Sequence, residues 1–237
     1  MYDRFLRIPG ADQAALARTH VVLIGCGGLG GEVGHGLARK GIGRLTLLDH
    51  DTVELTNLAR QFFLAEDLGQ NKALALAKRL AGQATGHTLI AGYAYSFQNA
   101  LAQGMEVDGD IAIVGVDNNP TRIAAAQYYR ARGKPAIFLA VDARAARGYV
   151  FVQTAQSDDP CFLCLFPDAG EDRRVHGCAG ASIEILKIVA GIALYAVDSL
   201  LMARPRPWNY KDVFLDQGQD GGRVIQRRPG CALCAGQ

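Results

Sequence analysis

A glycine-rich turn between a strand pattern and a helical pattern constrains the fold more than any other feature of the sequence. Residues 20–25 read HVVLIG, the turn continues as GCGGLG, and residues 30–40 have a helical pattern before the apolar run RLTLLD at residues 44–49. This order of strand, glycine turn, helix and strand is typical of the opening of a doubly wound α/β sheet. Backbone at such a turn can approach a phosphate, because the unpaired N–H groups of the helix N-terminus favour negative charge. We therefore predict a nucleotide site at the turn glycines Gly25, Gly27, Gly28 and Gly30.

The alternation of helices and strands continues through the middle of the chain. Helical patterns cover residues 71–82 and 120–133. Strand patterns cover residues 87–97, 110–117, 134–143 and 147–153. A long polar loop at residues 157–177 and an apolar helix at residues 182–202 follow, and the last strand patterns cover residues 211–217 and 222–228.

These patterns predict a single α/β domain over residues 1–237, with a Rossmann-like, doubly wound and mainly parallel sheet. Residues 19–150 would form the nucleotide-binding core, and residues 151–237 would add the crossover loop, the apolar helix and further strands. Hydrophobic residues make up 49% of the chain and charged residues 20%, which is typical of a globular protein. The net charge of +2 offers little attraction for nucleic acid, so a nucleic-acid partner is not expected.

Neither a membrane span nor an export signal is expected. The uninterrupted apolar run of the 182–202 helix covers residues 188–197, whereas roughly 20 apolar residues are needed to cross a bilayer. No basic and apolar leader precedes the first helical stretch. We therefore expect a cytoplasmic protein in which this helix is part of the core.

Several polar side chains beyond the second strand indicate which nucleotide binds. Asp49 ends that strand, where a carboxylate can accept hydrogen bonds from ribose hydroxyls. A nicotinamide site has no use for Asn57 and Arg60 just beyond it, whereas a triphosphate does. Arg60 can pair phosphate oxygens through its planar fork, and Lys72 can add a charge at a second phosphate. Asp117, at the end of a later strand, could hold Mg²⁺ against the phosphates.

The alternative is that Asp51, Arg60 and Lys72 form a solvated set of surface ion pairs with no ligand. The order of the motifs argues against it. GCGGLG, LLDHDTVELTNLARQ, LGQNKA and VGVDNN together resemble the ThiF/MoeB/HesA superfamily of ubiquitin-activating-like enzymes. The resemblance covers residues 2–234, and its second motif is very specific.

The resemblance implies a role for each motif residue. Asp49 would bind the ribose and Asp51 would lie near the metal. Phosphate ligands would be Asn57, Arg60 and Lys72, and Asp117 would support Mg²⁺ and the reacting carboxylate. Arg4 in MYDRF matches the family arginine that reaches into the ATP site of a partner subunit, which implies a homodimer; the first Arg and the Gln of that motif are missing here.

The chemistry implied is Mg²⁺- and ATP-dependent adenylation of the C-terminal carboxylate of a small ubiquitin-like protein ending in glycine. Onward transfer to a cysteine, or to a downstream conjugating or sulfur-transfer protein, would follow. The reaction brings two anions together, so a site rich in cations suits it, and an ionised carboxylate needs no general base. Three alternatives stay open: a peptide or tRNA-base carboxylate as substrate, an NAD-dependent oxidoreductase, and a non-catalytic partner that keeps the nucleotide pocket.

Two C-x-x-C pairs predict a structural zinc site that holds the tail of the chain. The ligands would be Cys161, Cys164, Cys231 and Cys234. The alternatives are a redox pair or unrelated buried thiols. Cys178 lies near Arg173, Arg174 and His176 at the start of the apolar helix, which favours its thiolate. The family resemblance implies that Cys178 accepts the acyl group; the alternative is a small buried residue.

Overall fold

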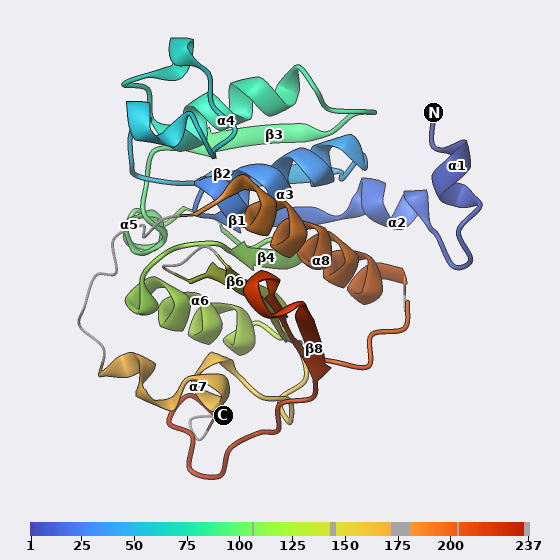
Figure 1. The fold of residues 1–237 in the computed structure, drawn as a ribbon, viewed down its shortest axis with the longest axis vertical. Coiled ribbons are helices and arrows are strands. Elements are labelled where there is room, and N and C mark those ends of the chain that lie inside the picture. The colour runs from blue at the N-terminus through green and yellow to red at the C-terminus, as the bar shows by residue number, and fades with distance from the viewer. Residues whose placement is uncertain (106, 143–145, 172–180, 203, 235–237) are drawn as a thin grey trace.

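The computed structural model describes residues 1–105, 107–142, 146–171, 181–202 and 204–234. Within them the chain forms an eight-stranded mixed sheet in the order β3-β2-β1-β4-β5-β6-β7-β8 (Figure 1). The strands are β1 (His20–Ile24), β2 (Arg44–Leu48), β3 (Leu89–Tyr93), β4 (Ile111–Val114), β5 (Ala136–Val141), β6 (Arg147–Gln153), β7 (Tyr210–Phe214) and β8 (Gln219–Arg223). Strands β1 to β5 pair in parallel, and β6 to β8 extend the sheet through antiparallel pairs. The predicted doubly wound sheet with added C-terminal strands is confirmed.

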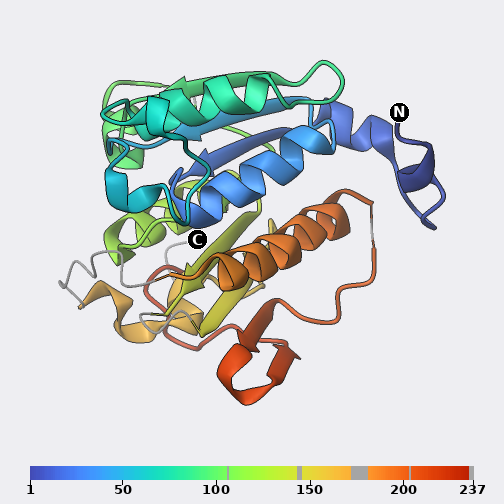
Figure 2. The same ribbon diagram turned by 45° about the horizontal axis from the view of Figure 1, so that its top comes forward.

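Helices cover both faces of the sheet, because alternate strand residues point to opposite sides. Val21 and Leu23 of β1 belong to one buried cluster, and Val22 and Ile24 belong to the other. The first cluster lies under α3 (Gly28–Arg39), α4 (Lys72–Ala81) and α8 (Ile183–Met202), with α3 and α8 side by side (Figure 2). The second lies under α5 (Phe97–Ala102), α6 (Asn119–Ala131) and α7 (Phe162–Leu165).

The apolar helix α8 is a core helix. It is the one helix in the described ranges that is long and apolar enough to cross a membrane. Its residues pack on α3, β5 and β6, and its Asp198 is only 4% exposed. That carboxylate is bonded by Lys40 Nζ and by Arg204 Nη1, the latter at 3.1 Å. A buried acid paired with two cations belongs to a packed protein interior.

Two glycines of the turn let α3 approach β1 closely. Gly25 has a φ of +93°, a conformation that side chains other than glycine rarely adopt. A Cβ atom at Gly30 would lie 1.9 Å from the carbonyl oxygen of Gly25. The glycine spacing is therefore required by helix–strand packing as well as by any ligand.

The C-terminal strands differ in position from the prediction. The pattern at residues 222–228 predicts a strand there, but β8 covers Gln219–Arg223, earlier in the chain. Gly218, with a φ of +60°, allows the tight return from β7, and pairing with β7 makes QDGGR a strand despite its polar sequence. Beyond β8, Asn209 Oδ1 accepts from Ile225 N at 2.7 Å and Asn209 Nδ2 donates to Ile225 O at 2.8 Å. The Asn209 side chain thus takes the place of the backbone hydrogen bonds that a strand at residues 224–228 would have formed.

Candidate active site

A cavity of about 1250 Å³ opens at the carboxyl ends of the parallel strands. This is the edge at which doubly wound sheets place their ligands. Asp117 and all but one of the predicted nucleotide-binding residues line this cavity. These nucleotide-binding residues are Gly25, Gly27, Gly28, Asp49, Asp51, Asn57, Arg60 and Lys72. The exception is Gly30, which packs against Gly25 behind the turn. The structure therefore brings together residues that are up to 92 positions apart (Gly25 to Asp117) in the sequence.

Asp49 ties the glycine turn to the end of β2. Its Oδ2 accepts from the backbone N–H of Cys26 at 2.7 Å, and its Oδ1 accepts from the N–H of Asp51 at 2.9 Å. Burial raises the pKa of Asp49, and these two N–H donors oppose the rise. Burial also raises the pKa of the Cys26 thiol well above its usual range, as expected of a small packing residue rather than a nucleophile.

Lys72 is held at the cavity by Asp51. Lys72 begins α4, its Nζ lies 2.9 Å from Asp51 Oδ2, and its side chain is 12% exposed. Asn71, which the sequence analysis missed, fixes the approach by donating from Nδ2 to the carbonyls of Asp49 and Asp51 at 2.9 and 3.0 Å. The Asn71 Oδ1 also caps α4 by accepting from Leu74 N, a role that its place at the start of the helical pattern could have indicated.

Asn57 shapes the segment that carries Arg60. The buried Asn57 Oδ1 accepts from Glu54 N at 3.0 Å, and the Asn57 carbonyl accepts from the N–H groups of Arg60 and Gln61 at 3.1 and 2.8 Å. Among the described residues, none hydrogen-bonds or ion-pairs with the Arg60 side chain. The surface ion-pair alternative thus fits Asp51 and Lys72 in part but leaves out Arg60, which pairs with no acid in the described part of the chain.

The acidic groups of the cavity offer ligands suited to a hard cation. Ligand atoms of Asp49, His50 and Asp51 lie within 4.8 Å of one another. Asp117 lies on an exposed bend after β4, at the opposite side of the glycine turn. Carboxylate oxygens combined with phosphate oxygens are the usual environment of Mg²⁺. The donor set therefore fits a magnesium ion that a triphosphate brings with it.

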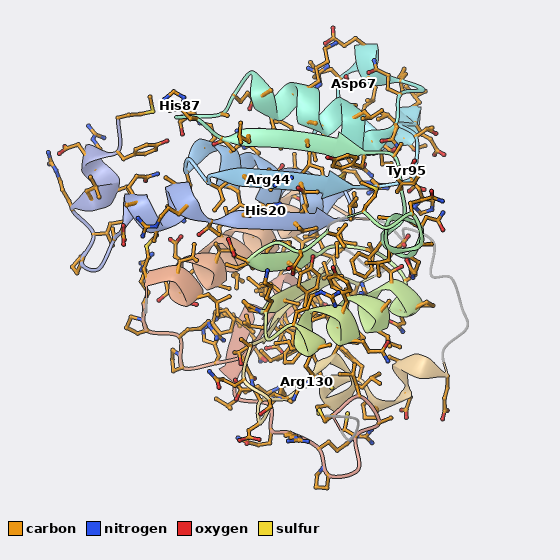
Figure 3. The ribbon with its side chains drawn as sticks, turned by 180° about the vertical axis from the view of Figure 1, so that it is seen from behind. His20, Arg44, Asp67, His87, Tyr95 and Arg130 are labelled. Atoms are coloured by element: carbon orange, nitrogen blue, oxygen red, sulfur yellow. The ribbon has the colours of Figure 1, made fainter. Side chains whose placement is uncertain are left out.

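Arg4 lies at the other end of the sheet. It is on α1 (Asp3–Leu6), which precedes α2 (Gln13–Arg18) and the amino end of β1 (Figure 1). In Figure 3, His87 and Tyr95 mark the two ends of the sheet, and α1 lies at the His87 end. Arg4 is exposed and does not line the cavity. It therefore has no place in the site of its own subunit.

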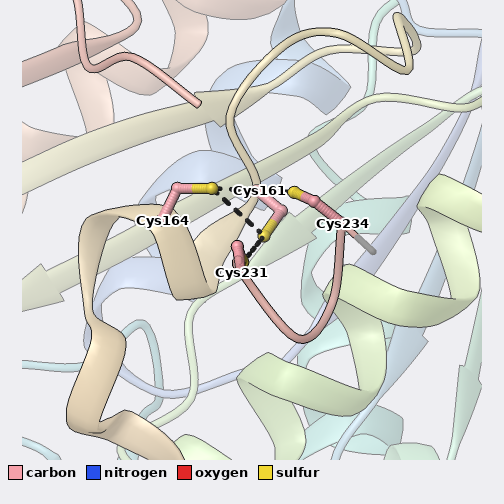
Figure 4. Close-up of side chains that lie close together, drawn as sticks. All are labelled: Cys161, Cys164, Cys231 and Cys234. Carbon is pink, nitrogen blue, oxygen red and sulfur yellow. Dashed lines mark hydrogen bonds between the residues drawn. The ribbon is translucent and has the colours of Figure 1, made fainter. Parts of the chain in front are cut away.

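The four predicted zinc ligands lie together on the face of the sheet covered by α6 and α7 (Figure 4). Their Sγ atoms are separated by 3.8 Å (Cys161–Cys164), 3.5 Å (Cys161–Cys231) and 3.6 Å (Cys164–Cys234). These distances are far above the length of an S–S bond of about 2.05 Å. They fit a tetrahedral zinc ion, for which Zn–S bonds of about 2.3 Å place the sulfurs about 3.8 Å apart.

The surroundings of these sulfurs shift their pKa values in both directions. Burial raises the pKa of Cys161 and Cys234; for Cys231, burial is outweighed by donors including Cys234 N and Leu233 N, and its pKa falls to about 7. Arg228 N donates to Cys164 Sγ at 3.3 Å. Arg130, 5% exposed and labelled in Figure 3, opposes the rise in the pKa of Cys234. The donor set therefore fits zinc. The prediction for Cys178 concerns a residue outside the described ranges.

Comparisons with known proteins agree with the geometry of the site. The chain belongs to the ThiF family, which it matches over residues 2–236. It is 32% identical over 232 residues to the sulfur carrier protein adenylyltransferase of Thermus thermophilus, covering 94% of this chain and 84% of that protein. It is 29% identical over 241 residues to the molybdopterin-synthase adenylyltransferase of Escherichia coli, covering 98% of this chain and 95% of that protein.

Longer relatives and solved structures extend the comparison. The adenylyltransferase and sulfurtransferase MOCS3 of Xenopus laevis is 33% identical over 245 residues; the alignment covers 99% of this chain but 53% of that protein. The chain thus spans about half the length of its MOCS3 relatives. The crystal structure of E. coli MccB with ATP has the same fold, with a TM-score of 0.79 at 21% identity over 94% of this chain and 68% of that one.

Proposed function

We propose that this protein is an ATP- and Mg²⁺-dependent adenylyltransferase that activates the C-terminal carboxylate of a small ubiquitin-like sulfur carrier protein. The observation that carries the proposal is the convergence of Asp49, Arg60, Lys72 and Asp117 on one cavity beside the glycine turn. The names of the two bacterial relatives, which act on a sulfur carrier protein and on molybdopterin synthase, support the choice of substrate.

The charges of the cavity suit the chemistry. A carboxylate attacking the α-phosphorus of ATP meets like charge, so cations must neutralise the reactants before they can come into contact. Arg60, which has no protein partner within the described residues, and Lys72 would hold the phosphates. Asp49 would hold the ribose, Asp51 and Asp117 would hold the Mg²⁺ ion, and the Asn57 turn would keep Arg60 in place.

The size of the cavity fits two reactants. Pockets for one small ligand typically measure about 300–1,000 Å³, whereas this cavity measures about 1250 Å³. Beyond the glycine turn it continues along Leu139, Val141, Tyr149 and Phe166. Those apolar and aromatic walls would accept the extended tail of the carrier protein, with its terminal carboxylate towards Asp117.

ATP–pyrophosphate exchange tests this proposal. The probe is a sulfur carrier protein that ends in Gly-Gly, and the matched control is the same protein with its terminal carboxylate amidated. We expect Mg²⁺-dependent exchange with the first protein and none with the second. An equal rate of exchange with the free and the amidated carrier protein contradicts the proposal. The absence of exchange with every carrier protein tested also contradicts it. Turnover of a nicotinamide cofactor would favour the oxidoreductase alternative instead.

We further infer a homodimer in which Arg4 completes the site of the partner subunit. The position of Arg4 at the far end of its own sheet supports this, because only a second copy could bring it to a cavity. Mixing Arg4→Ala and Lys72→Ala subunits is the test. If Arg4 acts in trans, each mixed dimer regains one intact site, so a 1:1 mixture should recover about a quarter of the wild-type rate. No recovery on subunit exchange would contradict the inference.

Two further parts of the proposal concern cysteines. Zinc held by Cys161, Cys164, Cys231 and Cys234 would be structural, since four thiolates leave no open position on the ion. Transfer of the acyl group to Cys178, or to a conjugating or sulfur-transfer protein in the cytoplasm, would follow adenylation. A Cys178→Ala variant should keep pyrophosphate exchange and lose any thioester that forms with the carrier protein. Retention of that thioester would remove Cys178 from the mechanism.

A further inference from the structure

Arg122 lies beside Asp117 in the cavity, although nothing in the sequence distinguishes it from the other arginines. It is in the first turn of α6, whose N-cap is Asn118. Its guanidinium bridges the two sides of the bend that carries Asp117: Nη2 donates to Val116 O at 2.7 Å, and Nη1 donates to Asn119 Oδ1 at 3.1 Å. One side chain thus holds the residue before Asp117 and the start of the helix after it.

No acid among the described residues pairs with the charge of Arg122. Among the described residues it forms no ion pair, and its Nε is buried without a hydrogen-bond partner. Burial raises the pKa of Tyr149, which also lines the cavity, and the charge of Arg122 opposes that rise. A half-buried cation with a buried Nε atom, whose contacts are a carbonyl and an amide, is costly unless its position has another use.

From these contacts we propose that Arg122 is a positioning residue for Asp117. Its planar fork fixes the bend at residues 116–119, so that the Asp117 carboxylate stays directed at the Mg²⁺·ATP complex of the proposed function. A lysine has one nitrogen and cannot hold Val116 O and Asn119 Oδ1 in one fixed plane. Arg122→Lys therefore keeps the charge but releases the bend, which separates positioning from a general electrostatic effect.

The test is binding of ATP measured by calorimetry, with and without Mg²⁺, so that it needs neither turnover nor a partner protein. We expect Arg122→Lys to weaken binding of Mg·ATP by about 10- to 100-fold, the effect typical of residues that orient a metal ligand. Binding of ATP in magnesium-free buffer should change by less than about threefold. Arg132→Lys is the matched control, because Arg132 is exposed at the C-cap of the same helix and stacks on Tyr128.

A double-variant cycle decides whether Arg122 acts through Asp117. In an Asp117→Asn background, Arg122→Lys should weaken Mg·ATP binding by less than about twofold, since contacts that act through one group are not additive. An undiminished effect in that background, an equal loss with and without Mg²⁺, or wild-type binding by Arg122→Lys each overturns the inference. The inference rests on the proposed function, in which Asp117 holds Mg²⁺. If the wild-type protein bound ATP equally well with and without Mg²⁺, that metal role of Asp117 would be overturned before any variant was compared. Thermal unfolding of Arg122→Lys shows whether the fold is retained.

Discussion

Replacing Lys72 by alanine should slow adenylation strongly while leaving the fold intact. In the structure Nζ pairs with Asp51 at 2.9 Å, and the side chain lines the cavity at the start of α4. Two unit charges about 4 Å apart interact by about 4 kcal/mol at an effective dielectric constant of about 20. A change of about 1.4 kcal/mol in the activation free energy changes the rate tenfold. If the Lys72 charge acted only on the phosphates, it would therefore accelerate the reaction by about 10³-fold.

The pairing with Asp51 reduces this value. Lys72 must share its charge between Asp51 and a phosphate, so we expect a loss of about 10²- to 10³-fold in the rate of ATP–pyrophosphate exchange. Asp51 is 53% exposed, so the ion pair itself should contribute no more than about 1 kcal/mol to stability. Lys72→Ala should therefore unfold at nearly the wild-type temperature.

A matched control lies on the same helix. Lys78 is exposed on α4 and lies outside the cavity, so Lys78→Ala should leave the exchange rate unchanged. If Lys72→Ala retains exchange within threefold of the wild type, or if Lys78→Ala slows it as much, the electrostatic reasoning is refuted.

Three other changes test different parts of the structure. Cys231→Ser should abolish binding of the proposed zinc ion and, by opening a cross-link between residues 70 positions apart, remove about 4 kcal/mol of stability; metal analysis and urea unfolding measure both. Asp67, 1% exposed and bonded to Arg79, has a lowered pKa because that pair and Leu64 N outweigh burial, so Asp67→Ala should cost about 3–5 kcal/mol at pH 7. The part of this contribution that comes from the lowered pKa is complete above the unfolded pKa of about 3.9 and is lost as pH falls through the folded pKa, so the difference between the two proteins in unfolding free energy should shrink there. Cys26 should resist iodoacetamide in the native protein, and rapid labelling seen by mass spectrometry would contradict its burial.

Local patterns were sufficient for the first half of the fold. The strand–turn–helix pattern around Gly25 predicted β1 and α3 because burial of alternate residues and the glycine spacing depend on near neighbours. The cysteine spacing predicted a cluster for a related reason, because each C-x-x-C pair places two sulfurs together within one turn. The position of β8 could not be predicted, since its sequence QDGGR becomes a strand only through its pairing with β7.

The site was predictable as a set of residues, but the contacts of each residue were not. Asn57 was predicted to hold phosphates, yet its Oδ1 accepts from Glu54 N and shapes the backbone, which the motif alone does not reveal. Asn71 and Arg122 were missed because an asparagine before a helix and an arginine within one have many ordinary uses. The structure shows that Asn71 joins α4 to the end of β2 and that the Arg122 side chain folds back over the Asp117 bend. The first contact is between separate chain segments, and the second depends on a side-chain conformation that the sequence does not specify.

The central claim is that a polypeptide carboxylate attacks the α-phosphorus of ATP in this cavity. Isotope transfer measures it most directly: a sulfur carrier protein labelled with ¹⁸O in its terminal carboxylate is incubated with the enzyme, Mg·ATP and hydroxylamine. The carboxylate oxygen becomes the bridge to phosphorus, and hydroxylamine then breaks the bond between that oxygen and the acyl carbon. We predict AMP that carries one ¹⁸O atom, detected by mass spectrometry, together with pyrophosphate. Unlabelled AMP, or release of ADP in place of AMP, would contradict the account.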